Sequence, residues 1–277
     1  MGDTIRHRGP DDEGYFTDDH CAIAHRRLSI IDLTEGGHQP MVSADGRYVL
    51  AYNGEIYNFQ TLRAELESLG RVFTTSSDTE VLLQGYIQWG AEVTKKLRGM
   101  FAFVIWDKQE QSLYGARDPF GIKPFYYAQM DGLFFFGSEV KSFLPHPGFK
   151  KELNQEALKF YLTFQYSALN ESFFKGAFRL LPGHQLVHKD GVTEITSYHS
   201  FLFEPDSRSL QEHAKEIREV VTESVKAHEI ADVEVGSFLS GGIDSSVIAC
   251  LSRPDKTYSV GFANKGFDET SEAQALC

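Results

Sequence analysis

The chain has 277 residues, of which 42% are hydrophobic and 24% charged, and its formal net charge at pH 7 is −12. This length predicts about two domains of roughly 150 residues each, and the acidic balance argues against nucleic-acid or anionic-membrane partners. No apolar run approaches the roughly 20 residues of a membrane span, and the first residues carry no apolar signal region. The cysteines are scattered and three in number, which argues against a disulfide framework or a structural zinc site and predicts a cytoplasmic location.

The first 150 residues read mainly as strands, by apolar alternation and turn signals. The predicted strands are Ala22–Leu28, Tyr48–Tyr52, Met100–Trp106, Ser112–Ala116, Phe125–Gln129 and Leu133–Gly137. The run Phe101–Trp106 is apolar throughout, which is typical of a strand covered on both faces. Helices are predicted over Phe59–Leu69 and Asp78–Trp89, each followed by a glycine, and Asp78 is placed to cap the second.

From Lys151 onward the pattern changes. A helix capped by Asn154 is predicted over Asn154–Thr163, and a hairpin is predicted around Asp190-Gly191. Residues 204–207 are polar and turn-rich, which predicts a linker. The elements predicted beyond it are those that start a parallel α/β sheet: an amphipathic helix Leu210–His228, a strand Glu234–Leu239, a helix Ser246–Leu251, a strand Thr257–Phe262 and the first turns of a helix over 269–277.

A glycine-serine loop joins the first of these strands to its helix, with the sequence Ser240-Gly241-Gly242-Ile243-Asp244-Ser245-Ser246. Bare backbone N–H groups and a helix N-terminus suit a phosphate group, but the Gly-Lys-Ser/Thr ending of a Walker loop is absent. Asp244 is available to hold Mg²⁺ beside the phosphates. The loop resembles the pyrophosphate loop of ATP pyrophosphatases, which form adenylates and release pyrophosphate. A plain turn between a strand and a helix is the alternative.

Short motifs in the first half carry candidate substrate-binding groups, although each alone is compatible with a turn or a helix cap. A free amino acid requires a cation for its carboxylate and an anion for its ammonium, and Arg27 and Asp78 supply that pair. Hydrolysis of a side-chain amide requires donors to the oxyanion of the tetrahedral intermediate. The carboxamide of Asn53 and the N–H of Gly54 supply these donors. The motifs are Arg6–Asp11, His25–Asp32, Tyr52–Asn58, Ser76–Glu80 and Ala116–Pro124.

In this order, and followed by the glycine-serine loop, the motifs resemble the glutamine-hydrolysing asparagine synthetases over essentially the whole chain. The resemblance implies that residues 1–203 form a class II (type 2) glutamine amidotransferase domain with an α+β Ntn-hydrolase fold, a four-layer αββα sandwich. It implies that residues 210–277 begin an asparagine synthetase domain of the ATP-pyrophosphatase kind, with an α/β parallel sheet.

The resemblance also implies the site residues and the reaction. Glutamine is expected to contact Arg27, Leu28, Ser29, Ile30, Ile31, Asn53, Gly54, Glu55 and Asp78. ATP is expected to contact Leu239, Ser240, Gly241, Gly242, Asp244, Ser245 and Val260, with Mg²⁺ at Asp244. The implied reaction makes asparagine from aspartate, glutamine and ATP through β-aspartyl-AMP, and a homodimer is one expected assembly.

The nucleophile is where the resemblance fails. In the family it is an N-terminal cysteine, whose thiol attacks the amide while its own α-amino group serves as base, whereas residue 2 here is Gly2. Cys21, Cys250 and Cys277 do not fit that role. We expect the family's first strand and helix to be missing before Arg6 and the synthetase domain to be incomplete. On that basis the polypeptide alone is expected to hydrolyse no glutamine.

Other functions stay open at this point. A related amidotransferase with the same two domains modifies a different carboxylate, and a β-lactam-synthetase-like ligase shares the architecture. A non-catalytic glutamine- or ATP-binding remnant is the alternative from another functional class. Phosphoribosyl-, glucosamine- and glutamate-forming amidotransferases share the first domain but lack the pyrophosphate loop, which disfavours them.

Overall fold

The computed structural model describes residues 1–264, 266 and 268–276. The chain divides into two units, Met1–Leu202 and Phe203–Cys277. Cys277 itself lies outside the described residues.

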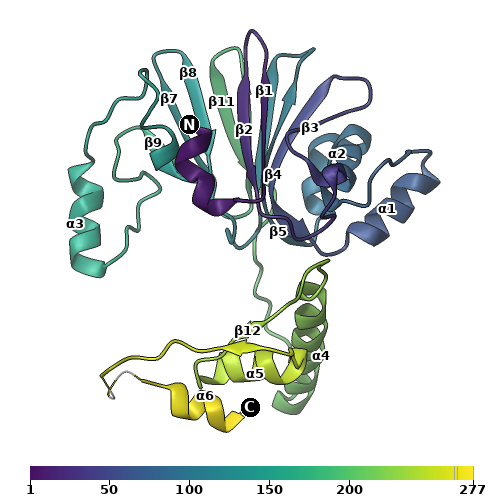
Figure 1. Cartoon of the computed structure of the whole chain (residues 1–277), viewed down its shortest axis with the longest axis vertical. Helices are drawn as coiled ribbons and strands as arrows, with labels where there is room; N and C mark the ends of the chain where they lie inside the picture. The colour runs from purple at the N-terminus through teal and green to yellow at the C-terminus, as the bar shows by residue number, and fades with distance from the viewer. Residues whose placement is uncertain (265, 267, 277) are drawn as a thin grey trace. The chain divides into compact units, whose positions relative to one another are not determined.

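A six-stranded antiparallel sheet forms the centre of the first unit, in the order β11-β10-β6-β5-β4-β3 (Figure 1). Its strands are β3 (Met41–Val42), β4 (Tyr48–Ile56), β5 (Gly99–Asp107), β6 (Ser112–Arg117), β10 (His184–Lys189) and β11 (Val192–Ser197). Two smaller antiparallel sheets consist of β1 (Asp12–Thr17) with β2 (Ala22–Arg27), and of β8 (Leu133–Gly137), β7 (Tyr126–Met130) and β9 (Ala177–Arg179). The helices of this unit are α1 (Phe59–Ser68), α2 (Asp78–Trp89) and α3 (Gln155–Phe164), with 3-10 turns at Gly2–Arg8, Glu35–Gly37, Gly90–Lys95 and Val140–Ser142.

Strand β5 is buried on both faces, as its unbroken apolar sequence predicts. Successive side chains of a strand point to opposite faces. One face of the sheet lies beneath α2, where the ring of Tyr86 stacks on Tyr114 with centroids 5.1 Å apart. Phe103 belongs to the same face, because its ring contacts Tyr114. Figure 1 shows α1 and α2 packed together against this side.

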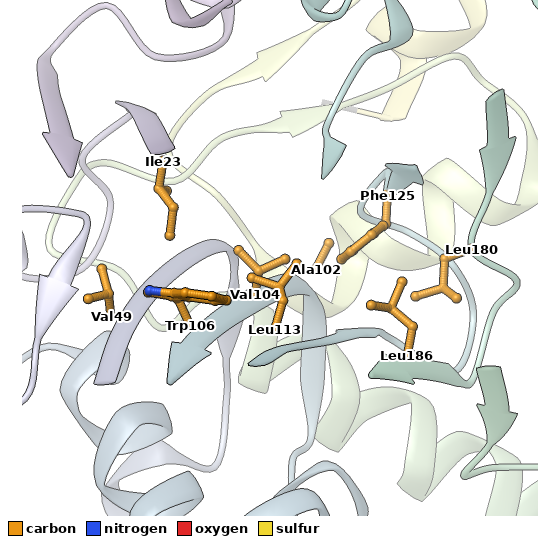
Figure 2. Packing of buried hydrophobic residues seen from close by; sticks show 9 residues of the cluster. All are labelled: Ile23, Val49, Ala102, Val104, Trp106, Leu113, Phe125, Leu180 and Leu186. Atoms are coloured by element: carbon orange, nitrogen blue, oxygen red, sulfur yellow. The ribbon is translucent and has the colours of Figure 1, made fainter. Parts of the chain in front are cut away.

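The opposite face of the large sheet meets the smaller sheets in an apolar cluster (Figure 2). Trp106 lies in this cluster and its Nε1–H donates to Asp18 Oδ2 at 2.7 Å, so its one polar group is satisfied despite burial. The helices, the large sheet and the smaller sheets therefore form successive layers. The cluster consists of Ile23, Val49, Ala102, Val104, Trp106, Leu113, Phe125, Leu180 and Leu186.

The outer face of the β8-β7-β9 sheet has a cluster of its own, in which Phe135 contacts Phe143 and Phe149. The segment that follows the 3-10 turn Val140–Ser142 supplies the rings of Phe143 and Phe149. In the described part of the chain, this segment covers part of the face on which a four-layer sandwich has helices.

Most of the strands and helices predicted in the first unit are confirmed, but β1, β3 and β9 were not predicted. The prediction that Asp78 caps α2 is wrong. Ser77 is the N-cap, with extended backbone dihedrals, and its Oγ accepts the Thr79 N–H at 3.1 Å. The Asp78 carboxylate is instead directed to β4, as described below.

The second unit contains α4 (Leu210–His228), β12 (Ser237–Phe238), α5 (Ile243–Ser252), β13 (Thr257–Tyr258) and α6 (Thr270–Leu276). Ser209 and Glu212 form a capping box at the start of α4, which fixes where that helix begins. The parallel pairing of β12 with β13 on either side of α5 confirms the predicted strand-loop-helix-strand order. Both strands are shorter than predicted. Among the described residues, none of the helices combines the length and apolar character needed to cross a bilayer.

Candidate active site

One cavity of the first unit, with a volume of ≈ 670 Å³, gathers eight of the nine predicted glutamine-binding residues. The exception is Ser29, whose N–H donates to Asp11 Oδ2 at 2.9 Å and which does not line the cavity. Sequence reasoning did not assign Arg8, His25, Tyr52 and Lys123, which also line it. The eight residues are Arg27, Leu28, Ile30, Ile31, Asn53, Gly54, Glu55 and Asp78.

The alternation of backbone groups along β4 determines toward which edge of the strand the Gly54 N–H is directed. In an antiparallel strand, successive residues send their N–H and C=O groups to alternate edges. The Tyr52 N–H donates to Gln39 Oε1 at 2.7 Å, and the Ile56 N–H donates to Asp78 Oδ2 at 3.0 Å. Gly54 lies midway between these two, so its N–H is directed to the same edge, away from β5. Gln39 and Asp78 both line the cavity.

Gly54 is required here by close packing. A Cβ at this position would overlap the carbonyl oxygen of Met100 and lie 2.7 Å from the Tyr52 ring. The neighbouring Asn53 has a buried Nδ2 amide with no hydrogen-bond partner among the described residues. A buried donor without a partner costs free energy, and such groups in native proteins call for a specific explanation. Two adjacent donors on one strand suit an oxyanion.

Asp78 places a carboxylate at the cavity wall with only 4% of the residue exposed. Burial raises the pKa of this carboxyl, and the Ile56 N–H and Tyr52 O–H oppose that effect by donating to its charged form. The Tyr52 hydroxyl donates to Oδ2 at 2.8 Å. A buried carboxylate held in this way is a suitable partner for an ammonium group.

Arg27 is buried and holds the loop that follows β2. Its Nη1 donates to the Thr34 carbonyl at 3.0 Å, and its Nη2 donates to the carbonyls of Ile31 and Asp32. These bonds use three of the five N–H donors of a guanidinium. Gly37 is required beside it, because a Cβ there would overlap the guanidinium. The predicted carboxylate-binding cation therefore also fixes the loop that lines the site.

His25 lies on the same face of β2 as Arg27, because the two residues are two positions apart on the strand. This spacing is the sequence signal from which His25 could have been placed at the site. Its Nε2 is 3.0 Å from the Tyr52 carbonyl oxygen. Because a carbonyl only accepts, Nε2 carries the hydrogen. Burial lowers the pKa of His25 to about 4, so the ring is neutral at pH 7. His25 and Gln39 together bond the backbone of Tyr52 on the edge of β4 that faces away from β5, where no strand pairs with it.

The cysteine of the first unit is not placed to attack an amide in this cavity, because Cys21 does not line it. Burial raises the pKa of Cys21 to about 12, which disfavours the thiolate. Cys250 is exposed on α5 of the second unit.

The second unit has a cavity of ≈ 500 Å³ at the glycine-serine loop. Of the predicted ATP-binding residues, Leu239, Ser240, Ser245 and Val260 line it. The other three belong to the same turn: Gly241 has a φ of +80°, Gly242 is the N-cap of α5 and Asp244 lies in the first turn.

The loop is held by its own serines. Ser245 Oγ lies 3.2 Å from the Ser240 N–H and 3.1 Å from the Gly242 carbonyl oxygen. No cluster of three His, Cys, Asp or Glu side chains suited to a metal ion occurs among the described residues.

Comparison with known families gives a match in each of the two units. Residues 1–199 match the family model of the glutamine amidotransferase domain. The chain belongs to the glutamine amidotransferase family. Residues 216–277 match the asparagine synthase family model, and the chain as a whole is a homologue of the glutamine-hydrolysing asparagine synthetases.

Two curated relatives from Bacillus subtilis (strain 168) illustrate the similarity. The chain is 45% identical to "Asparagine synthetase [glutamine-hydrolyzing] 1" over 279 aligned residues, covering 99% of this chain and 44% of the relative. It is 37% identical to "Asparagine synthetase [glutamine-hydrolyzing] 3", covering 95% of this chain and 44% of the relative. The chain thus spans a little under half the length of these relatives.

A solved structure supports the fold alone. Glutamine phosphoribosylpyrophosphate amidotransferase from B. subtilis, complexed with ADP and GMP, has a TM-score of 0.52 and 19% sequence identity, covering 96% of this chain and 64% of that chain. The first unit therefore has the α+β fold of a class II, Ntn-like glutamine amidotransferase.

The neutral, buried His25 predicts a pH-dependent stability. The pKa of His25 is about 4 in the folded chain and about 6.5 in an unfolded chain, so the unfolded state binds more protons between these values. The free energy of unfolding should fall by about 2 kcal/mol for this group as the pH drops from 7 to 5. Urea unfolding at the two pH values measures it. His25→Gln keeps an N–H donor without titrating, and it should show a change about 2 kcal/mol smaller; equal changes in both proteins would contradict the prediction.

Proposed function

We propose that this protein acts in the glutamine-dependent synthesis of asparagine from aspartate and ATP, through β-aspartyl-AMP and with release of pyrophosphate. The convergence of Arg27, Asn53, Gly54 and Asp78 on one cavity carries the proposal. The match of the second unit to the asparagine synthase family supports the synthetase half and aspartate as acceptor. Residues 1–203 are proposed as the amidotransferase domain, a four-layer αββα sandwich, and 210–277 as the start of the ATP-pyrophosphatase domain. The homodimer and the cytoplasmic location stay predictions.

The ammonium, the carboxylate and the side-chain amide of glutamine are each proposed to bind a different group of the site. Its ammonium pairs with Asp78, and its carboxylate accepts from guanidinium hydrogens of Arg27 beyond those given to the loop. Its side-chain carbonyl oxygen meets Asn53 Nδ2 and the Gly54 N–H, which stabilise the negative charge that develops on that oxygen during hydrolysis. The uncommitted Nδ2 of Asn53 supports this placement.

An extended segment that carries the attacking thiol is proposed to occupy the rest of the cavity. β2 pairs only with β1, and β8 pairs only with β7, so each strand has an open edge among the described residues. All six residues of β2 and all five of β8 line the cavity, together with Phe16, Phe125 and other apolar residues. Open edges beside an apolar cavity are suited to an added strand.

The nucleotide is proposed to bind at the loop of the second unit. Leu239 and Val260 contact the nucleoside, while the N–H groups at the start of α5 hold the phosphates. Mg²⁺ held by Asp244 supplies charge neutralisation at the phosphates when it is bound. The same N–H groups stabilise the pyrophosphate as it leaves.

Glutamine binding tests the first site. Asp78→Asn keeps the shape of the side chain but removes the partner of the ammonium, so the Kd for L-glutamine should rise about tenfold or more. Isothermal titration calorimetry measures it. Asp131→Asn, which removes an equal charge at an exposed hairpin turn, should leave the Kd unchanged. Equal Kd values for Asp78→Asn and the unmodified chain would contradict the proposal.

Complementation with a thiol tests the catalytic role. A synthetic peptide with a free N-terminal cysteine followed by apolar strand-forming residues should restore glutamine hydrolysis, followed as ammonia release. The matching peptide with an N-terminal serine should not. Asn53→Ala removes one oxyanion donor and should lower the restored rate about 100-fold. Hydrolysis by the chain without any peptide would contradict the assignment of the nucleophile.

Nucleotide binding tests the second site. Asp244→Asn should raise the Kd for ATP about tenfold in the presence of Mg²⁺ and leave it unchanged in EDTA, because only the metal-dependent part of the affinity is lost. A fluorescent ATP analogue reports both values. Asp255→Asn, an exposed aspartate of the same unit, is the matched control. A loss of equal size with and without Mg²⁺ would argue against a metal ligand.

A further inference from the structure

Tyr52 is held at several points at once. Its N–H donates to Gln39 Oε1 at 2.7 Å, and its carbonyl accepts from His25 Nε2 at 3.0 Å. Its hydroxyl donates to Asp78 Oδ2 at 2.8 Å, and only 4% of the residue is exposed. Backbone and side chain are therefore both fixed by partners that line the cavity.

The ring of Tyr52 also has a fixed place on the sheet. Tyr52 and Gly54 are two residues apart on β4, so they share a face. A Cβ on Gly54 would lie 2.7 Å from the ring, which means that the ring extends over the glycine toward α2. The absence of a side chain at Gly54 thus lets the hydroxyl reach Asp78 at the start of that helix.

We propose that Tyr52 is a positioning residue that sets the selectivity of the site for an α-ammonium group. Its hydroxyl and the Ile56 N–H both donate to Oδ2 of Asp78, and the backbone N–H groups of Thr79 and of Asp78 itself also stabilise the charged form of this carboxylate at the start of α2. This inference rests on the proposed function, because it takes Asp78 as the partner of the glutamine ammonium. Tyr52 acts through Asp78 and touches no reacting atom.

The physical reason is the soft torsion of an aspartate side chain. The terminal χ2 torsion of Asp is broad, so loss of the Tyr52 donor leaves the carboxylate plane freer to turn about the backbone donors that remain. The Tyr52 hydroxyl and these backbone donors together fix the plane. An anion fixed in advance costs less to order when the ligand binds, which increases affinity for the group that it contacts.

Selectivity between two ligands tests the proposal. L-glutamine and 4-carbamoylbutanoate differ only in the α-amino group, and both are titrated calorimetrically into the full chain. Tyr52→Phe should raise the Kd for L-glutamine about tenfold and change the Kd for 4-carbamoylbutanoate less than about twofold. Thermal unfolding confirms that the variant is folded.

A matched control is available in the same sheet. Tyr114 is also buried, and its hydroxyl is 2.8 Å from Gln185 Oε1, but it does not line the cavity. Tyr114→Phe should change neither Kd. In the Asp78→Asn background, Tyr52→Phe should have no further effect on glutamine, because the residue through which it acts has been changed.

The outcomes separate the inference from the function on which it rests. If Tyr52→Phe weakens the binding of both ligands equally, Tyr52 has a structural role and the inference is overturned. The inference is also overturned if Tyr52→Phe changes neither Kd. In both cases a weakened Asp78→Asn variant leaves the proposed glutamine site standing. If the unmodified chain binds no glutamine, or Asp78→Asn binds it equally well, the proposed function and the inference fail together.

Discussion

The candidate site depends on the unpaired edge of β4. Strand β5 pairs with β4 along its whole length, whereas β3 reaches only Val49 and Leu50 on the other edge. Beyond that point, Gln39, His25 and Asp78 take the place of a partner strand by bonding the outward N–H and C=O groups. A longer β3 would satisfy these groups and close the edge. The shortness of β3 is therefore what leaves the Gly54 N–H and its neighbours directed toward the cavity.

Charge is distributed unequally around this edge. The Asp78 carboxylate is buried, and burial alone favours its neutral form. Donation from Tyr52 and Ile56 offsets part of the lost hydration, and the ammonium group of the proposed ligand would offset more of it. Arg27 differs, because three loop carbonyls already accept from it. In the proposed site, the anionic half would thus gain more from glutamine than the cationic half, and recognition of the ammonium would be the more sensitive of the two.

Local patterns in the sequence predict the elements better than the roles of single side chains. The unbroken apolar run of β5 and the glycine-serine loop before α5 were both recognisable, because burial on two faces and a tight turn each require particular residue types. β1 was missed because half of its residues are exposed and it depends on pairing with β2. Of the nine residues that the family resemblance assigned to glutamine, all except Ser29 line the cavity. The role of Tyr52 could not be predicted from local sequence, because it depends on the fold that brings its hydroxyl to Asp78, 26 positions away.

The size of the first cavity and the chemistry proposed for it lead to the same requirement. Its ≈ 670 Å³ lies in the range of drug-sized sites, about 300–1,000 Å³, and exceeds what one amino acid fills. Hydrolysis through the Asn53 and Gly54 donors also requires a nucleophile close to them, and Cys21 of the first unit lies outside the lining. β2 and β8 offer backbone groups along the same cavity that only another strand satisfies fully. The extended segment proposed above, with a thiol at its end, would fill the volume, pair both edges and deliver the nucleophile, whereas a separate small ligand would meet only the first of these needs.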